Sequence, residues 1–447
     1  MKPVLLWSDA LILLLLALVA AGVWRMRHND TFRAPLRRVW ASPAGSATAL
    51  ILAVYVGVGL LDSLHYVARL PDVPGQPAQY SGEVKSALDA LLNPLHAQVE
   101  KTYSAPFATH LYARETLTGP DGREVRDFPR LKQGGAHLAD PENEFWPDVL
   151  KRGGLGVLGG IVCWALLAFP LLRRGGSRRA LAMTLVFLLV GTGLLVALAP
   201  HYHVLGTDKV GQDVLYLSLK SIRTGLLIGS LTTLVMLPLA LGLGIAAGYF
   251  GGKVDDLIQY VYTTLNSIPG VLLIAASVLV VQVQIEAHPE LFDTAAARSD
   301  VRLLALVAIL GLTGWTGLAR LLRAEALKLR ELEFVQAARA FGVTHARILT
   351  RHLLPNVMHL VLISVVIDFS GLVLAEAVLS YVGVGVDPAM ISFGNMINGA
   401  RLELAREPVV WWQLAAAFLF MFVLVLAANL FADQVRDALD PKTRGRS

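Results

Sequence analysis

Few side chains in this sequence are arranged for catalysis. The phosphate-binding pattern G-x-x-x-x-G-K-[ST], the H-E-x-x-H zinc helix and the G-x-S-x-G nucleophile elbow are all absent from it. His201 and His203 have no matched third ligand, which favours exposed interface residues over a metal site. Cys163 is the single cysteine, so neither an intrachain disulfide nor a thiolate cluster can form. We therefore expect no catalytic residue, no metal and no cofactor, and no ATP bound through a phosphate loop.

Two carboxylates, Asp368 and Glu376, fall in or near the apolar stretch from Val357 to Val378. Ionisable groups inside a bilayer usually face a bundle interior or a water-filled cavity. Both residues are therefore candidates to meet a substrate or to carry protons. The alternative, that Glu376 closes a helix end and Asp368 pairs within the chain, is equally open.

Irregular backbone beside apolar stretches gives further gate or pathway candidates. Asp208 and Asp213 lie in a glycine-containing turn before a helix. The turn suits an interfacial gate or scaffold; a direct substrate site is open as well, although an ordinary structural turn is favoured over it. Asn266 and Pro269 place a polar side chain and a helix break within an apolar stretch. Lipid does not tolerate such backbone unless protein or a water-filled path covers it.

The most informative segment runs from residue 332 to residue 356. Phe334, Ala337, Ala338 and Phe341 recur at helical spacing, which predicts one apolar face on a short helix. Gly342 is a helix stop, Thr344 a cap for a second short helix, and Pro355 suits the first turn of the next span. The segment predicts a helix, a tight turn and a second helix along a membrane surface.

This apolar face, with basic residues around it, allows two functions. It suits insertion into a groove on a soluble partner, with Arg347 and Arg351 nearby. It equally suits an amphipathic helix that rests among lipid headgroups. Periodicity alone does not choose between them.

The elements that must position these residues are membrane helices. The composition is 55% hydrophobic and only 16% charged, which is typical of a membrane protein and not of a soluble core. The Lys and Arg residues behind the net charge of +5 cluster in short loops, which argues against a nucleic-acid partner. Nine stretches approach the roughly 20 residues that a span needs: Leu5 to Trp24, Pro43 to Leu61, Leu155 to Leu172, Leu181 to Leu198, Leu226 to Ala247, Ile258 to Val283, Leu303 to Leu322, Val357 to Val378 and Trp412 to Phe431.

The distribution of basic loops predicts the orientation in the membrane. Basic clusters at Arg25 to Arg38, Arg173 to Arg179, Lys253, Arg323 to Arg351 and Arg436 to Arg446 all fall on one side under strict alternation, and that side should be the cytoplasm. The opposite connections, including the acidic Ile285 to Asp300, are poor in positive charge. The N-terminus should lie outside, as a retained anchor, and the C-terminus inside.

The polar stretch after the second span predicts a small extracytoplasmic loop domain. Ser86 to Val99 reads as an amphipathic helix interrupted at Pro94, and Thr116 to Arg130 as loop or hairpin with a turn at Asp121-Gly122. We expect two transmembrane helices over 1–62, the loop domain over 63–151, a third helix and basic cytoplasmic loop over 152–179, a helical core over 180–441 with a cytoplasmic loop at 323–356, and a cytoplasmic tail over 442–447.

The segment around Gly342 resembles the loop of binding-protein-dependent ABC importer permeases. In that family a Glu-Ala-Ala triplet is followed by a spaced Gly and by Leu-Pro. Here Gln336-Ala337-Ala338, Gly342, Leu354 and Pro355 stand at those positions, with Gln336 in place of Glu and His352 in place of a common Ile. Arg351 to Asn356 looks like the dipeptide and oligopeptide branch.

Further matches run in order from His201 to Pro441. They are Leu205 to Asp213, Ala247 to Gly252, Glu376 to Gly385 and Arg436 to Pro441, with Gln212 where the family commonly has Arg. The resemblance implies an all-α integral membrane protein with a six-helix permease core, preceded by about three extra transmembrane helices and the extracytoplasmic loop domain.

The resemblance also implies a function and partners. It implies a permease subunit of an ABC importer, not an enzyme, which translocates short peptides or, in family variants, nickel chelates or other solutes. The implied partners are a second homologous permease, two cytoplasmic ATPase subunits or domains that dock on the segment at 332–354, an extracytoplasmic solute-binding protein and membrane lipid. An ion-coupled secondary transporter, using Asp368 or Glu376, and a membrane sensor are the alternatives.

Overall fold

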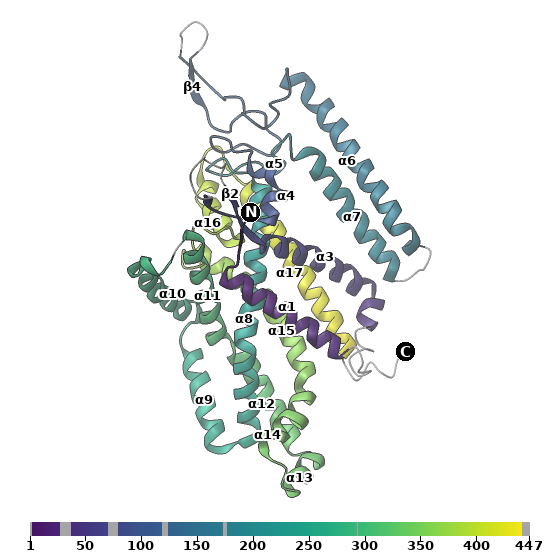
Figure 1. The fold of residues 1–447 in the computed structure, drawn as a ribbon, viewed down its shortest axis with the longest axis vertical. Coiled ribbons are helices and arrows are strands. Elements are labelled where there is room, and N and C mark those ends of the chain that lie inside the picture. Colours follow the sequence, from purple (N-terminus) through teal and green to yellow (C-terminus); the bar gives the residue numbers. More distant parts are fainter. Residues whose placement is uncertain are drawn as a thin grey trace. The chain divides into compact units, whose positions relative to one another are not determined.

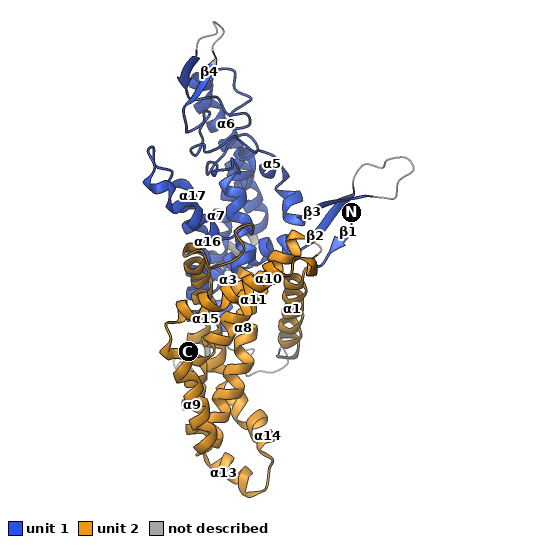
Figure 2. Cartoon of the chain, turned by 90° about the vertical axis from the view of Figure 1, so that its left-hand side faces the viewer, with its two compact units in different colours: residues 1–5, 34–225, 390–434 blue, residues 6–33, 226–389, 435–447 orange. Residues whose placement is uncertain are grey.

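The computed structural model describes residues 2–26, 37–69, 79–118, 124–172, 177–292 and 294–439. The chain divides into two compact units, which Figure 2 colours separately: residues 1–5, 34–225 and 390–434 form unit 1, and residues 6–33, 226–389 and 435–447 form unit 2. The long helix α8 (Val214–Phe250) begins in unit 1 and continues in unit 2.

The described residues form a predominantly helical membrane protein. Eight helical stretches are long and apolar enough to cross a bilayer, and α1 (Trp7–Met26) holds a shorter apolar stretch, Trp7–Gly22. Each of the nine predicted spans overlaps one of these stretches. The helical membrane fold inferred from composition is therefore confirmed.

Unit 1 contains the helices α3 (Pro43–Asp62), α6 (Pro141–Leu172), α7 (Ser177–Leu198) and α16 (Phe393–Arg401), with a 3-10 turn at Glu403–Ala405. It also contains α17 (Trp412–Leu439) as far as Gln434, and the last residues of that helix belong to unit 2. Helices α6 and α7 lie side by side (Figure 1). A Cβ atom at Gly160 would lie 2.6 Å from the backbone of Val190, so these two helices approach closely because a side chain is missing.

The polar stretch between α3 and α6 holds short elements. Strands β2 (His65–Arg69) and β3 (Tyr80–Ser86) form an antiparallel sheet with β1 (Lys2–Val4), which precedes α1 in the chain, in the order β1-β2-β3. Strand β4 (Glu115–Thr118) pairs with β5 (Glu124–Asp127). The helix expected over 86–99 is divided at Leu92 into α4 (Ala87–Leu91) and α5 (Asn93–His96), since Pro94 interrupts it. The hairpin expected after Thr116 is present, and its predicted turn at Asp121-Gly122 lies outside the described residues.

This polar stretch is bound to the segment that precedes α8. The Glu100 amide donates to the Gly211 carbonyl, and the amides of Phe107 and Gly135 donate to the carbonyls of His203 and His201, each at 2.9 Å. These backbone bonds join residues roughly 70 to 110 positions apart in sequence. The stretch therefore packs as part of unit 1 and not as a separate tethered body.

Unit 2 contains α1, the remainder of α8, α9 (Gly252–Ser267), α10 (Gly270–Ala287), α11 (Ala295–Gly314), α12 (Thr316–Arg330) and α15 (Leu354–Tyr381). A 3-10 turn at Pro289–Leu291 lies between α10 and α11. The first turn of α1 contacts α11, because the Ser8 amide donates to the Asp300 carboxylate at 3.0 Å.

The sixth span differs from its predicted limits. The sequence suggested one span from Ile258 to Val283, but α9 ends at Ser267 and only α10 qualifies as a membrane span. The expected break at Pro269-Gly270 is present, because Pro269 stands at the N-cap of α10 and has no amide to continue the earlier helix.

Several basic clusters used to predict the orientation lie outside the described residues. These are most of the connection after α1, including Arg27 and Arg33, the pair Arg173 and Arg174, and the tail with Lys442, Arg444 and Arg446.

Candidate functional site

The predicted helix and turn around Gly342 are present in unit 2. Helix α13 (Glu333–Ala340) follows α12 directly, with Leu332 in extended backbone at its N-cap. Glu333 in the first turn and Arg339 in the last turn both complement the helix dipole.

Helix α13 has an inner and an outer face. Val335 is fully buried in a core with Tyr249, Ile348 and Val357, and the half-buried Ala338 packs against the same core. Phe334 is 44% exposed and Phe341 is 86% exposed. The four residues predicted to share one apolar face are therefore divided, since Ala338 faces inward while Phe334, Ala337 and Phe341 remain accessible. We call these three exposed residues the α13 patch.

The turn after α13 depends on glycine. Gly342 has a φ of +74°, its amide donates to the Arg339 carbonyl at 3.0 Å, and the Val343 amide donates to the Ala338 carbonyl at 3.0 Å. This pair of bonds is the Schellman motif, which ends a helix with a left-handed residue. The predicted stop at Gly342 is confirmed.

The second short helix is not a separate element. Thr344 occupies the N-cap of α14 (His345–Ile348), although its side chain makes no capping bond. A π-helical turn (Leu349–Leu353) then leads directly into α15, with Pro355 in its first turn as predicted. Leu353 is fully buried and Leu354 half-buried in the same core as Val335, which holds this end of α15 against α13.

Aromatic and basic side chains connect the turn after α13 to α8. The Tyr249 hydroxyl lies 2.7 Å from His345 Nδ1, and the Arg339 guanidinium lies 4.5 Å from the centre of the Tyr249 ring. Arg339 also donates to the Tyr249 carbonyl at 3.4 Å. Sequence reasoning did not assign this cluster. The only signal for it was the match at Ala247 to Gly252, which contains Tyr249.

The two departures from the family triplet have local explanations. Gln336 donates from its amide nitrogen to the Glu331 carbonyl at 3.1 Å, at the end of α12. An ionised Glu at this position has no proton to donate to that carbonyl. The His352 ring packs beside Phe334, with ring centres 6.0 Å apart. Arg347 and Arg351 are both exposed.

An ion pair joins α9 to α12, the helix that precedes α13. Both carboxylate oxygens of Asp255 on α9 accept from Arg323 on α12 at 2.6 Å. The hydrogen bonds and charge of Arg323 hold the pKa of Asp255 below its usual range, against the opposing effect of burial. In the sequence, Arg323 had served only as part of a basic cluster that predicts the orientation in the membrane.

Asp208 and Asp213 are engaged in local structure of unit 1. The Asp208 carboxylate accepts from the amides of Val210 and Gln212 at 3.0 and 2.8 Å, which closes the turn. Asp213 accepts from the amides of Leu215 and Tyr216 at 2.8 and 3.2 Å, in the first turn of α8. These contacts favour the structural alternative for both residues.

His203 was predicted to be exposed, and that expectation is wrong. It is fully buried, with Nδ1 2.8 Å from Asp213 and Nε2 3.5 Å from Glu100. Burial lowers its pKa, but the hydrogen bonds and charges of the two carboxylates dominate and raise the pKa of His203 to about 9. The backbone amides of residues 132–134 complete the cradle around Glu100.

The pathway candidates in unit 2 behave differently from one another. Asn266 accepts a hydrogen bond from Thr316 at 3.2 Å, near the break that Pro269 makes. Glu376 is buried and accepts from Ser380, one turn further along α15, at 2.8 Å. Asp368 is half-buried, and no hydrogen bond or ion pair joins its carboxylate to another described residue.

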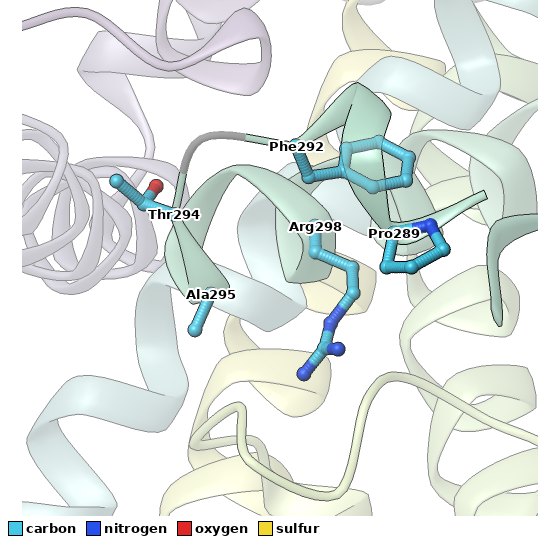
Figure 3. A pocket seen from close by; sticks show the side chains of 5 residues that line it. All are labelled: Pro289, Phe292, Thr294, Ala295 and Arg298. Carbon is cyan, nitrogen blue, oxygen red and sulfur yellow. The ribbon is translucent and has the colours of Figure 1, made fainter.

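A pocket of about 170 Å³ lies at the connection from α10 to α11 and the first turn of α11 (Figure 3). It is lined by Pro289, Phe292, Thr294, Ala295 and Arg298. None of the predicted site residues lines this pocket. Arg298 belongs to the acidic connection from Ile285 to Asp300, which the sequence had marked only as poor in positive charge.

Comparison with known proteins extends the sequence resemblance. The family described as "Binding-protein-dependent transport system inner membrane component" matches residues 240–445. The oligopeptide transport permease OppC of Mycobacterium bovis is 33% identical over 242 residues, which cover 54% of this chain and 77% of that protein. OppC of Haemophilus influenzae is 31% identical over 243 residues, covering 54% and 71%.

A solved methionine ABC transporter, MetNI, superposes with a TM-score of 0.37 at 17% identity, covering 49% of this chain and 93% of that one. The family assignment therefore rests on the sequence relatives and not on this superposition. Since an oligopeptide permease aligns over three-quarters of its length at 33% identity, the chain belongs to the binding-protein-dependent family of ABC importer inner-membrane permeases.

Proposed function

We propose that this permease forms one half of an ATP-driven importer of short peptides and that the α13 patch docks on an ATPase subunit. One observation carries the docking proposal: Phe341 is 86% exposed at the end of a helix whose other face is fixed in a buried core. A large exposed ring on a rigid base is suited to fill a pocket on a partner, because little conformational entropy is lost on binding.

Peptide cargo is supported by the relatives. Those named above are permeases of oligopeptide transport systems, and a further one, 32% identical over 244 residues, is a glutathione transport permease of Pectobacterium atrosepticum. Glutathione is itself a short peptide. Within this proposal, nickel chelates and other solutes are the less favoured cargo.

The partners follow from the family and from the single α13 patch. A permease with one docking element needs a second, homologous permease to engage a pair of ATPase subunits or domains. The family description implies a solute-binding protein outside the membrane. In this arrangement the segment at 323–356 and the C-terminus lie in the cytoplasm, while the N-terminus and residues 63–151 lie outside.

The contacts of α13 give a route for coupling. When ATP binding closes the ATPase pair, force on Phe341 reaches α15 through the buried contacts of Val335. The same force reaches α8 through the contacts of Arg339 and His345 with Tyr249. The helices then switch access between the outside and the inside, with Asn266, Pro269, Asp368 and Glu376 as pathway candidates and Asp208 and Asp213 as candidates for an outer gate.

The energy source separates this proposal from its rivals. The experiment is peptide uptake into proteoliposomes that contain the chain and its co-purifying subunits, with either ATP or an imposed ion gradient. We expect uptake with ATP alone. Uptake driven by an ion gradient without any ATPase would favour a secondary transporter. Peptide binding to residues 63–151 without uptake would favour a sensor.

A further inference from the structure

Asp368 is placed at the centre of a membrane-spanning helix. Helix α15 runs from Leu354 to Tyr381, so Asp368 follows its first residue by 14 positions and precedes its last by 13. At about 1.5 Å per residue, the carboxylate lies roughly 20 Å from either end, close to the middle of a hydrocarbon core about 30 Å thick. A carboxylate at this depth is rare and usually functional.

The chain itself does not neutralise this carboxylate within its described residues. Several basic side chains of unit 2 have other partners. Arg302 pairs with Asp387 and Glu286, Arg323 with Asp255, Arg330 with Glu331, and Arg339 with Tyr249. The other intramembrane carboxylate of α15, Glu376, is buried and bonded to Ser380. Asp368 therefore differs from Glu376 in being partly accessible and in having no partner among the residues that the structure describes.

The side of α15 near Asp368 is open. Gly371, almost one turn further along, is exposed, and a Cβ atom added there would meet nothing within 4 Å. The adjoining side is closed, because a Cβ atom at Gly229 of α8 would lie 2.6 Å from the ring of Phe369. Ser364, one turn before Asp368, is also small. A ligand group can approach the carboxylate from the open side without displacing a large side chain.

A carboxylate at this depth is stable only when it meets water, hydrogen-bond donors or a cation. The proposed cargo supplies a cation at every turnover, because an unmodified peptide carries an N-terminal ammonium group. We propose that Asp368 is a cation-binding residue of the transport pathway, which receives positively charged groups of the peptide as it crosses. This inference rests on the proposed function.

The test compares peptides that differ only in charge. Wild-type chain, Asp368→Asn, Asp368→Glu and the control Asp256→Asn, at an exposed carboxylate on α9, are reconstituted with their co-purifying subunits and saturating binding protein. ATP-driven uptake is measured for Ala-Lys-Ala and Ala-Glu-Ala. Because the binding protein is the same throughout, a change in the Lys/Glu ratio between variants arises in the permease.

We expect Asp368→Asn to lower the Lys/Glu ratio of kcat/KM roughly fivefold, as for the loss of one partly solvated ion pair, with Asp368→Glu and Asp256→Asn close to wild type. An active Asp368→Asn transporter whose Lys/Glu ratio and whose kcat/KM for both peptides match wild type would overturn the inference, because both peptides carry the N-terminal ammonium group. So would loss of the second permease on co-purification, since Asp368 would then pair with a subunit. If even the wild-type chain imports no peptide with ATP, the proposed function fails and this inference fails with it.

Discussion

Replacing Phe341 with Ala tests the docking surface directly. The side chain is 86% exposed. A phenylalanine buries roughly 200 Å² when it is enclosed, so about 170 Å² remains available, equivalent to about 4 kcal/mol at about 25 cal/mol per Å². Association recovers only part of such an area, and Ala retains Cβ. We therefore expect a loss of about 2 kcal/mol, or roughly 30-fold in Kd.

The assay is titration of the co-purifying ATPase subunit onto the chain held in lipid nanodiscs. Phe341→Leu is the matched control, because it keeps an apolar side chain of similar reach and should lose much less affinity. The thermal midpoint of the chain should not change, since Phe341 lies outside the buried core. An Ala variant that binds the ATPase within threefold of wild type would refute the docking surface.

Two further predictions concern stability. Gly342→Ala should lower the free energy of unfolding by about 1 kcal/mol, because the φ of +74° is unfavourable for Ala while a Cβ atom there meets nothing within 4 Å. Gly211→Ala should prevent stable folding, because its Cβ atom would collide with the Glu100 carbonyl. Equal thermal midpoints for the two variants would contradict this. The pKa of His203 is raised in the folded chain from 6.5 to about 9, so its contribution of about 3 kcal/mol is complete below pH 6.5 and is lost as the pH rises through 9. The thermal midpoint should fall more between pH 6 and pH 9.5 for wild type than for His203→Gln. An equal fall in the two proteins would count against the buried ion pair.

Apolar periodicity and residue chemistry determined much of this protein in advance. Runs of about 20 apolar residues can be satisfied in a bilayer only as helices, so the spans could be placed without a structure. The helix end at Gly342 and the helix break at Pro269 could also be predicted, because a left-handed turn and a missing amide are properties of single residues. The segment around Gly342 also matched a family in its order and spacing.

Tertiary structure decided which face of each element is covered. Periodicity placed Ala338 with Phe341, but the core around Val335 draws Ala338 inward and leaves Phe341 exposed. Tertiary structure also decided which polar groups are buried, paired or charged, because their partners are distant in sequence. His203 is buried and charged because Asp213 and also Glu100, about 100 residues earlier, lie against it, while Asp368 has no partner among the described residues. A sequence fixes local conformation through short-range sterics, but burial and charge pairing arise from contacts between distant segments, which only the folded chain brings together.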